Sequence, residues 1–261
     1  MGEIMTSNDK EAFIALIAPI GIDMNQVISV ITEKAAQIRY HPNVIKLTEF
    51  FSENGLVEKS YKNEVERYEA YIKAGDDLCE KAGRGDILSL IGVAKMLYGG
   101  HERRRDLSKT RTLNIIRQIK RLDEYNTLER IYGRNIIFVG CYSSIESRKN
   151  YLVDRMRFSN RTSNTSKLES DALKIISIDE DEADKDYGQK IIDCYPKSDF
   201  ILDCTSRRTL EDSCERLFKI YFGHPFVSPT MDEYSSYIAN AAAYRSLARP
   251  IHETAPRGRS A

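Results

Sequence analysis

The sequence lacks the features that mark several large classes of protein. Acidic and basic residues both number 39 among 261 residues, so the formal net charge is zero. Zero net charge argues against bulk electrostatic attraction to nucleic acid or to an anionic membrane, and it leaves only binding through a local basic patch. The longest apolar stretch near the N-terminus, Ala12 to Ile20, is too short to cross a bilayer. Charged residues precede it and no clear cleavage pattern follows, so we do not interpret it as a signal peptide. We expect a cytoplasmic protein with no membrane partner.

The cysteines and histidines do not form the common zinc motifs. The five cysteines contain no C-x-x-C pair and their number is odd, which favours reduced thiols over disulfides or a metal site. None of the four histidines begins an H-x-E, so the zinc-deaminase signature, H-x-E followed by P-C-x-x-C, is absent. The motifs G-x-S-x-G and H-E-x-x-H are absent too. We predict that this chain holds no cofactor, binds no stoichiometric zinc and deaminates neither dCMP nor dCTP.

Short apolar runs alternate with segments of helical period. Ala12 to Ala18 is a buried-strand candidate followed by Pro and Gly, a helix begins near Met24 with Asp23 as N-cap, and a second strand covers Val44 to Leu47. This is a βαβ unit with parallel strands. Further strands are predicted at 112–116, 135–141 and 200–204, and further helices at 76–98, 123–132, 145–156, 210–221 and 234–242. We predict a three-layer α/β domain with a mainly parallel sheet.

Composition divides the chain into segments. Residues 1–11 are predicted to be a frayed N-terminus, 12–222 the α/β domain, 223–246 a linker with one helix, and 247–261 a disordered tail. Within the domain we predict a mobile loop over 157–170, which is rich in Ser, Thr and Asn. The run from Asp179 to Asp186, with six acids and one lysine, is predicted to be solvated.

The junction after the first strand is the natural anion site of such a fold, because the N–H groups at a helix N-terminus favour negative charge. A phosphate loop needs G-x-x-x-x-G-K-[ST], whereas this one has a single glycine, no lysine and no hydroxyl, and Asp23 would repel a phosphate. A structural turn is the better interpretation, and we predict weak nucleotide binding at most. The candidate binding residues are Pro19, Ile20, Gly21, Ile22, Asp23 and Met24.

Two groups of basic residues accompany the third and fourth strands. Nucleotide kinases place arginines at such positions to hold phosphates, although a solvated face is the better interpretation for any single one. We hypothesise that Arg148 supplies part of the positive charge that the loop lacks. The groups are Arg111, Arg117, Lys120 and Arg121 around the third strand, and Arg148, Lys149, Arg155 and Arg157 on or just after the helix that follows the fourth.

Several stretches resemble the anti-phage deoxycytidylate (dCMP/dCTP) deaminase family. The resemblance covers about residues 12–246, and its most specific part is FGHPFVSPTMDEY at 222–234. Residues 241–246 look like the first helix of the family's deaminase domain. Other similar stretches are 15–21, 44–48, 129–140 with Arg148, 187–189 and 198–200.

The resemblance implies a phosphate-loop, nucleotide-kinase-like domain followed by a zinc deaminase that depletes deoxycytidine nucleotides in defence against phage. Ala18 and Ile22 depart from the family's loop pattern, and the resemblance ends after Ser246. We therefore interpret the chain as truncated before the zinc site, with zinc expected only in full-length members. The segment 232–247 would be an orphan deaminase helix able to self-associate. The predicted function is a nucleotide-binding or regulatory module; an active nucleotide kinase and a non-catalytic interaction module are the alternatives.

Overall fold

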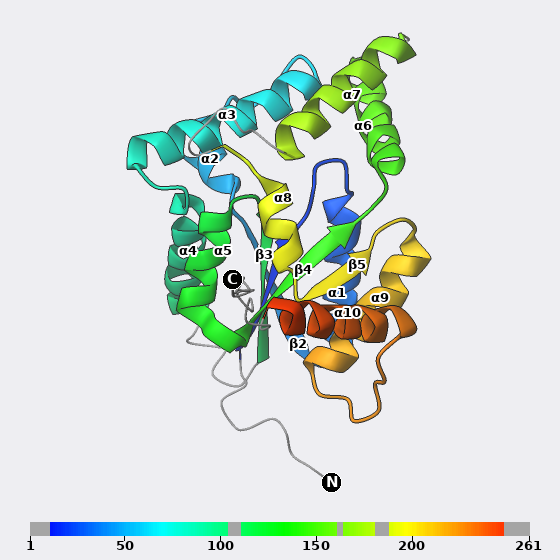
Figure 1. Ribbon diagram of the computed structural model, residues 1–261. Helices are drawn as coiled ribbons and strands as arrows, with labels where there is room; N and C mark the ends of the chain where they lie inside the picture. The colour runs from blue at the N-terminus through cyan, green and yellow to red at the C-terminus, as the bar shows by residue number, and fades with distance from the viewer. Residues whose placement is uncertain (1–10, 104–110, 161–163, 181–187, 248–261) are drawn as a thin grey trace, which may run out of the picture.

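The computed structural model describes residues 11–103, 111–160, 164–180 and 188–247; the predicted tail at 247–261 and frayed segment at 1–11 fall almost wholly outside these ranges. Five parallel strands form one sheet in the order β2-β3-β1-β4-β5 (Figure 1). The predicted parallel sheet is confirmed. The strands are β1 (Glu11–Ile17), β2 (Tyr40–Lys46), β3 (Arg111–Ile119), β4 (Ile136–Tyr142) and β5 (Phe200–Asp203).

Helices cover both faces of this sheet, as the three-layer prediction requires. The helices α1 and α9 pack on one face, and α4, α5 and α8 pack on the other. The helices are α1 (Met24–Gln37), α2 (Glu49–Glu53), α3 (Glu64–Ala82), α4 (Ile87–Arg103), α5 (Leu122–Tyr132), α6 (Ile145–Asn160), α7 (Thr165–Glu180), α8 (Ile191–Cys194), α9 (Arg207–Tyr221) and α10 (Met231–Leu247).

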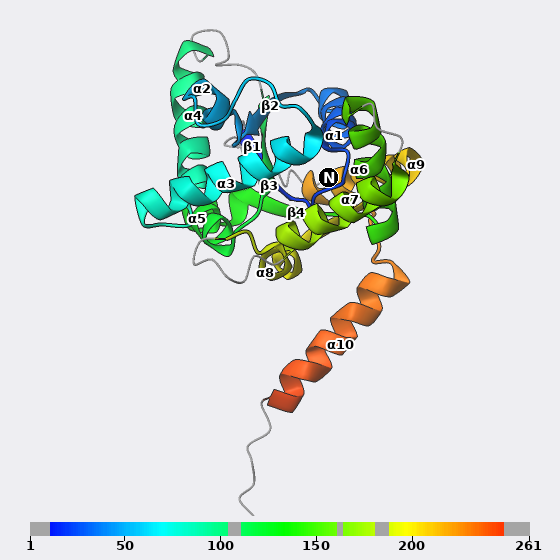
Figure 2. The ribbon, with the colours of Figure 1, turned by 90° about the horizontal axis from the view of Figure 1, so that it is seen from above.

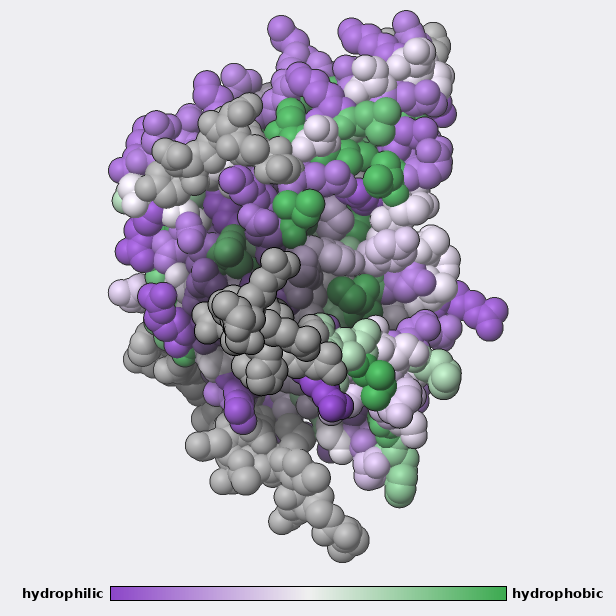
Figure 3. Space-filling view, viewed as in Figure 1, coloured by the Kyte–Doolittle hydropathy of each residue, from purple (hydrophilic) through white to green (hydrophobic). Residues whose placement is uncertain are grey.

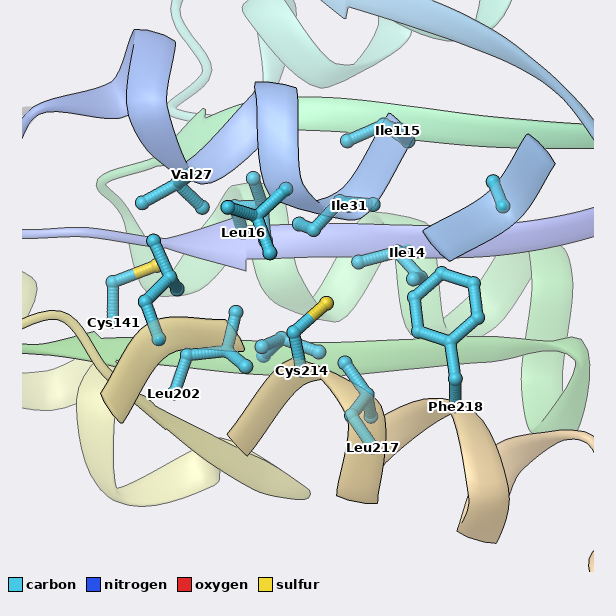
Figure 4. Close-up of a cluster of buried hydrophobic side chains, with 14 of the residues drawn as sticks. Ile14, Leu16, Val27, Ile31, Ile115, Cys141, Leu202, Cys214, Leu217 and Phe218 are labelled. Carbon is cyan, nitrogen blue, oxygen red and sulfur yellow. The ribbon is translucent and has the colours of Figure 1, made fainter. Parts of the chain in front are cut away.

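The central strand β1 is apolar along its length because it is buried on both faces. Ile14 and Leu16 point to the layer of α1 and α9, where they meet Val27, Ile31 and Leu217 (Figure 4). The alternate residues of β1 belong to the core on the opposite face. A continuous apolar run is typical of a parallel strand covered on both sides.

A further group of helices lies beyond the carboxyl ends of the strands. In Figure 1 the helices α3, α6 and α7 sit above the strand tips, and Figure 2 shows them crossing over the sheet when seen from above. Ile20, in the loop after β1, packs into the core between α6 and α7 with Leu152, Met156 and Ile176. The loop that was predicted as a candidate site is therefore held between the sheet and this upper group.

Three predicted boundaries are wrong, each for a local reason. The helix predicted at 76–98 is two helices, because Gly83 adopts a left-handed φ of 62° that ends α3. The loop predicted at 157–170 is mostly helical: α6 continues to Asn160, and Asn164 caps α7 by accepting from the Lys167 N–H at 3.2 Å. The second strand begins at Tyr40 rather than Val44 and includes Pro42, which an edge strand tolerates.

The last described helix, α10, projects from the rest of the molecule (Figure 2). Its residues from Met231 to Arg245 are all exposed, and Arg216 of α9 ties its first turn through an ion pair with Glu233. Self-association through this helix stays a prediction. None of the described helices has both the length and the apolar composition needed to cross a membrane.

Limited proteolysis should cut first between residues 223 and 247 and leave a resistant fragment of about 12–222. The linker contains glycine and prolines, and a lone helix of this length is only marginally stable. Mass spectrometry of early fragments checks this. If α10 resists protease as well as the central strands do, in a chain shown to be monomeric, the segment boundaries proposed above are wrong.

Candidate functional site

A cavity of about 290 Å³ opens at the carboxyl edge of the sheet, below α3 and α6. The loop after β1 leads to α1 on one face, and the loop after the adjacent β3 leads to α5 on the other. Ligands of open α/β sheets bind at such a switch point. Figure 3 shows hydrophilic side chains gathered over α3 beside this edge. The basic and aromatic lining residues are Lys46, Arg67, Arg117, Lys120, Arg121, Arg155, Tyr68, Tyr71 and Tyr151.

The predicted loop forms part of the cavity wall, but its helix N-terminus is already occupied. Ile20 to Met24 line the cavity, whereas Pro19 does not. The Asp23 carboxylate accepts from the N–H groups of Asn25 and Gln26 at 3.0 and 3.3 Å, which confirms the predicted N-cap. The N–H of Met24 bonds to the Ile22 carbonyl at 2.9 Å, and the regular helical bonds begin with the Val27 N–H, which bonds to the Asp23 carbonyl at 3.1 Å. The N–H groups of Met24, Asn25 and Gln26, which a helix usually leaves open at its start, are therefore satisfied within the loop.

A buried ion pair fastens the loop from behind. Asp179, at the end of α7, accepts from the Ile20 N–H at 2.7 Å and from Lys120 Nζ at 2.6 Å. Lys120 also donates to the Ala18 carbonyl at 2.8 Å. Asp179 is only 1% exposed, so the prediction that the acidic run is solvated is wrong at its first residue. Two strong donors compensate the burial of this carboxylate; the run from 181 to 186 lies outside the described residues.

Arg148 lies behind the loop rather than among the residues that line the cavity. It is 4% exposed and donates to Glu180 Oε1 at 2.6 Å and to the Ile20 carbonyl at 3.4 Å. Gly21, at φ 90°, packs so closely that an added Cβ would lie 2.7 Å from the Arg148 Cβ. The structure thus gives Arg148 a role in positioning the loop.

The other basic residues noted in the sequence divide into two kinds. Lys149 and Arg157 pair with acids on their own helix, at 3.0 and 3.6 Å, and form the solvated face expected of α6. Arg111 lies at the far end of β3, over the ring of Tyr40. The remaining four, Arg117, Lys120, Arg121 and Arg155, line the cavity.

Arg117 reaches the cavity from an irregular end of β3. Ala15 pairs with Ile116 and Ile17 with Ile119, so two residues of β3, Arg117 and Gln118, lie opposite one of β1. Gln118 has a φ of 63°, which is strained for a residue with a side chain. Such bulges re-aim side chains beside functional sites.

The Arg117 guanidinium is short of partners. It donates to Asn25 Oδ1 at 3.3 Å, and its buried Nε has no hydrogen-bond partner among the described residues. Burial lowers the pKa of Arg117; Tyr151, Asp23 and Tyr68 oppose this, and the positive charge of Arg155 adds a smaller lowering effect. Arg155 itself donates to the Tyr151 hydroxyl at 3.4 Å and contacts Glu64 at 3.5 Å. Burial opposes the charge of Arg155, but Tyr151 and the other neighbours outweigh it and raise the pKa.

Arg121 is committed to a buried network in the cavity wall. Its guanidinium lies 2.6 Å from Asp76 and 3.4 Å from Glu124. Glu124 is fully buried and also accepts from the N–H groups of Lys120 and Arg121. Burial raises the pKa of Glu124, while Arg121 opposes this rise. These three side chains stabilise the start of α5 against α3.

Sequence reasoning missed the contribution of α3. Tyr68 and Tyr71 line the cavity, and Arg67 lies 4.6 Å over the Tyr68 ring while pairing with Glu64 at 2.8 Å. Burial raises the pKa of Tyr68. No helix was predicted between the second strand and residue 76. The helical spacing of Tyr68, Tyr71 and Ile72 was the available signal.

The thiols and potential metal ligands are dispersed. All five cysteines are free, and four of them are buried, which confirms the prediction of unpaired thiols. Within the described ranges, no three His, Cys, Asp or Glu side chains come together as a metal site. The absence of zinc from the protein stays a prediction.

Comparison with known proteins finds little similarity to this chain. No protein-family model matches this sequence, and no curated protein matches it significantly. One similar solved structure is a gluconokinase from Sinorhizobium meliloti 1021, at 14% identity and a TM-score of 0.36, with 82% of this chain and 97% of that chain covered. Similarity this low carries no argument about function. The interpretation of the site therefore depends on its own geometry.

Replacing Asp179 by Ala should lower the free energy of unfolding by about 3–5 kcal/mol, because it leaves Lys120 buried without its partner. Denaturant unfolding measures this. Glu169→Ala, on the same helix but partly exposed, is the matched control and should change stability by about 0.5 kcal/mol or less. Equal effects of the two substitutions would show that the ion pair does not fasten the loop.

Proposed function

We propose that the cavity binds a nucleotide and that the chain acts as a nucleotide-binding or regulatory module. The observation that carries this proposal is the meeting of guanidinium groups and tyrosine rings in one cavity at the switch point of the sheet. Guanidinium groups bind phosphate oxygens, and aromatic rings stack on bases. A volume of about 290 Å³ suits a mononucleotide.

The arrangement favours binding over phosphoryl transfer. A kinase needs a lysine that holds the transferring phosphates and a hydroxyl on magnesium, and the loop after β1 has neither. Lys120 does reach the cavity, but its Nζ is engaged by Asp179 and by the Ala18 carbonyl. Phosphoryl transfer is therefore the second candidate, to be tested by an ATP-turnover assay.

The resemblance to deoxycytidylate deaminases makes dCMP and dCTP the first nucleotides to test. Under this proposal the module would sense or hold such nucleotides in a protein of phage defence. We propose that the chain itself neither binds zinc nor deaminates, because its sequence lacks H-x-E and C-x-x-C. Metal analysis and an assay for uracil products test this, and either one zinc per chain or steady turnover would contradict it.

Thermal unfolding with dCMP, dCTP, AMP and ATP tests the proposed function directly. A nucleotide at a hundred times its dissociation constant should stabilise the protein by about 2.7 kcal/mol. Tyr151→Ala should reduce the shift because Tyr151 lines the cavity, whereas Tyr98→Ala, at an exposed position of α4, should leave it unchanged. If no nucleotide raises the melting temperature, the proposed function is wrong.

Arg148→Ala should weaken nucleotide binding and also lower the stability of the free protein. Removing the side chain deprives Glu180 and the Ile20 carbonyl of a buried donor and loosens the loop. Calorimetry and ligand-free unfolding measure the two effects. Weaker binding with unchanged stability would show that Arg148 contacts the nucleotide itself, as the sequence suggested.

A further inference from the structure

We infer that the nucleotide is held by a single phosphate group between Arg117 and Arg155, without a metal ion, and that the loop after β1 makes no phosphate contact. This inference rests on the proposed function. It names the phosphate-binding residues and the class of ligand, a nucleoside monophosphate.

The loop is closed to phosphate by its own carboxylate. Asp23 occupies the N–H groups of Asn25 and Gln26, the donors that would otherwise face an anion at the start of α1. A phosphate there would have to displace Asp23 and would meet its negative charge at close range. The sequence has in effect placed an anion of its own at the helix N-terminus.

Arg117 presents the opposite situation, positive charge without enough acceptors. Arg117 has a buried Nε with no hydrogen-bond partner among the described residues, and its guanidinium donates to a neutral amide oxygen, that of Asn25. Tyr151, Asp23 and Tyr68 partly offset the burial of this charge, and the positive charge of Arg155 opposes it. A buried Nε without an acceptor is unfavourable. A phosphate between Arg117 and Arg155 would supply the acceptor that Arg117 lacks, and Arg155 would contact it beside its own partners Tyr151 and Glu64.

The backbone around Arg117 supports the same assignment. The extra residue in β3 opposite Leu16, and the positive φ of Gln118, are unfavourable local features at the end of a central strand. Arg117 and Gln118 both line the cavity as a result. The need to direct the Arg117 side chain into the cavity accounts for this unfavourable backbone.

The lining carboxylates are not available for a magnesium ion. Asp23 caps α1, Glu124 serves Arg121 and the start of α5, and Asp179 serves Lys120 and Ile20. Magnesium in nucleotide sites is held by one or two free carboxylates together with phosphates. A triphosphate would therefore bring about four negative charges to a site that is lined by Arg117, Arg155 and Lys46 but has no metal position. A monophosphate brings about two, which Arg117 and Arg155 can compensate.

Calorimetry with AMP, ADP and ATP, and with dCMP and dCTP, tests this inference. We expect the monophosphates to bind at least as tightly as the triphosphates and to be unaffected by EDTA. Arg117→Gln should weaken monophosphate binding by about tenfold to a hundredfold, because charged hydrogen bonds are lost. Arg157→Gln, on the exposed side of α6, is the matched control and should bind normally. Ribose 5-phosphate, run beside AMP, shows whether the base contributes.

Three outcomes are decisive against the inference. The first is nucleotide binding that is unchanged by Arg117→Gln and by Arg155→Gln, in proteins that circular dichroism shows to be folded. This result would refute phosphate binding by the two arginines but would not contradict the proposed function. The second is tighter binding of triphosphates that requires magnesium. This result would refute the assignment of a nucleoside monophosphate as the ligand but would not contradict the proposed function. If none of the nucleotides binds the unaltered protein, the proposed function fails and this inference fails with it.

Discussion

The buried ion pair between Asp179 and Lys120 is the interaction on which the rest of the site depends. It joins the end of α7 to the end of β3, and through the Ile20 N–H and the Ala18 carbonyl it fixes the loop after β1. With the loop fixed, Ile20 packs between α6 and α7, and those helices stay over the strand tips.

The charges around the loop after β1 are arranged in an unusual way for a βα junction. The helix N-terminus, which attracts anions, carries the Asp23 carboxylate, and the neighbouring end of β3 carries Arg117 without a carboxylate partner among the described residues. Under the proposal, anion binding falls to guanidinium side chains instead of backbone N–H groups. Side chains suit recognition of a phosphate, whereas phosphoryl transfer needs a metal and a lysine that this loop does not offer.

The sheet and its order of elements could be predicted from the sequence because β1 is a continuous apolar run and α1 has a clear helical period. The candidate loop was found for the same reason. Asp179 could not be identified as buried, since it opens an acidic run and its partner Lys120 is 59 residues away. The sequence could not show that Arg148 supports the loop whereas Arg117 lines the cavity. The two roles depend on which side of the loop each side chain reaches. The polar composition of α3 hid its helix; Tyr68 and Tyr71 line the cavity and also pack against the two neighbouring cores.

The central claim is that the phosphate is bound by the two arginines and not by the loop. A crystal structure of the protein with a nucleoside phosphorothioate, whose sulfur can be located by anomalous scattering, tests it most directly. The account predicts the sulfur and phosphorus beside Arg117 and Arg155, with Asp23 still capping α1. A phosphate seated on the N–H groups of Asn25 and Gln26, with Asp23 displaced, would contradict it.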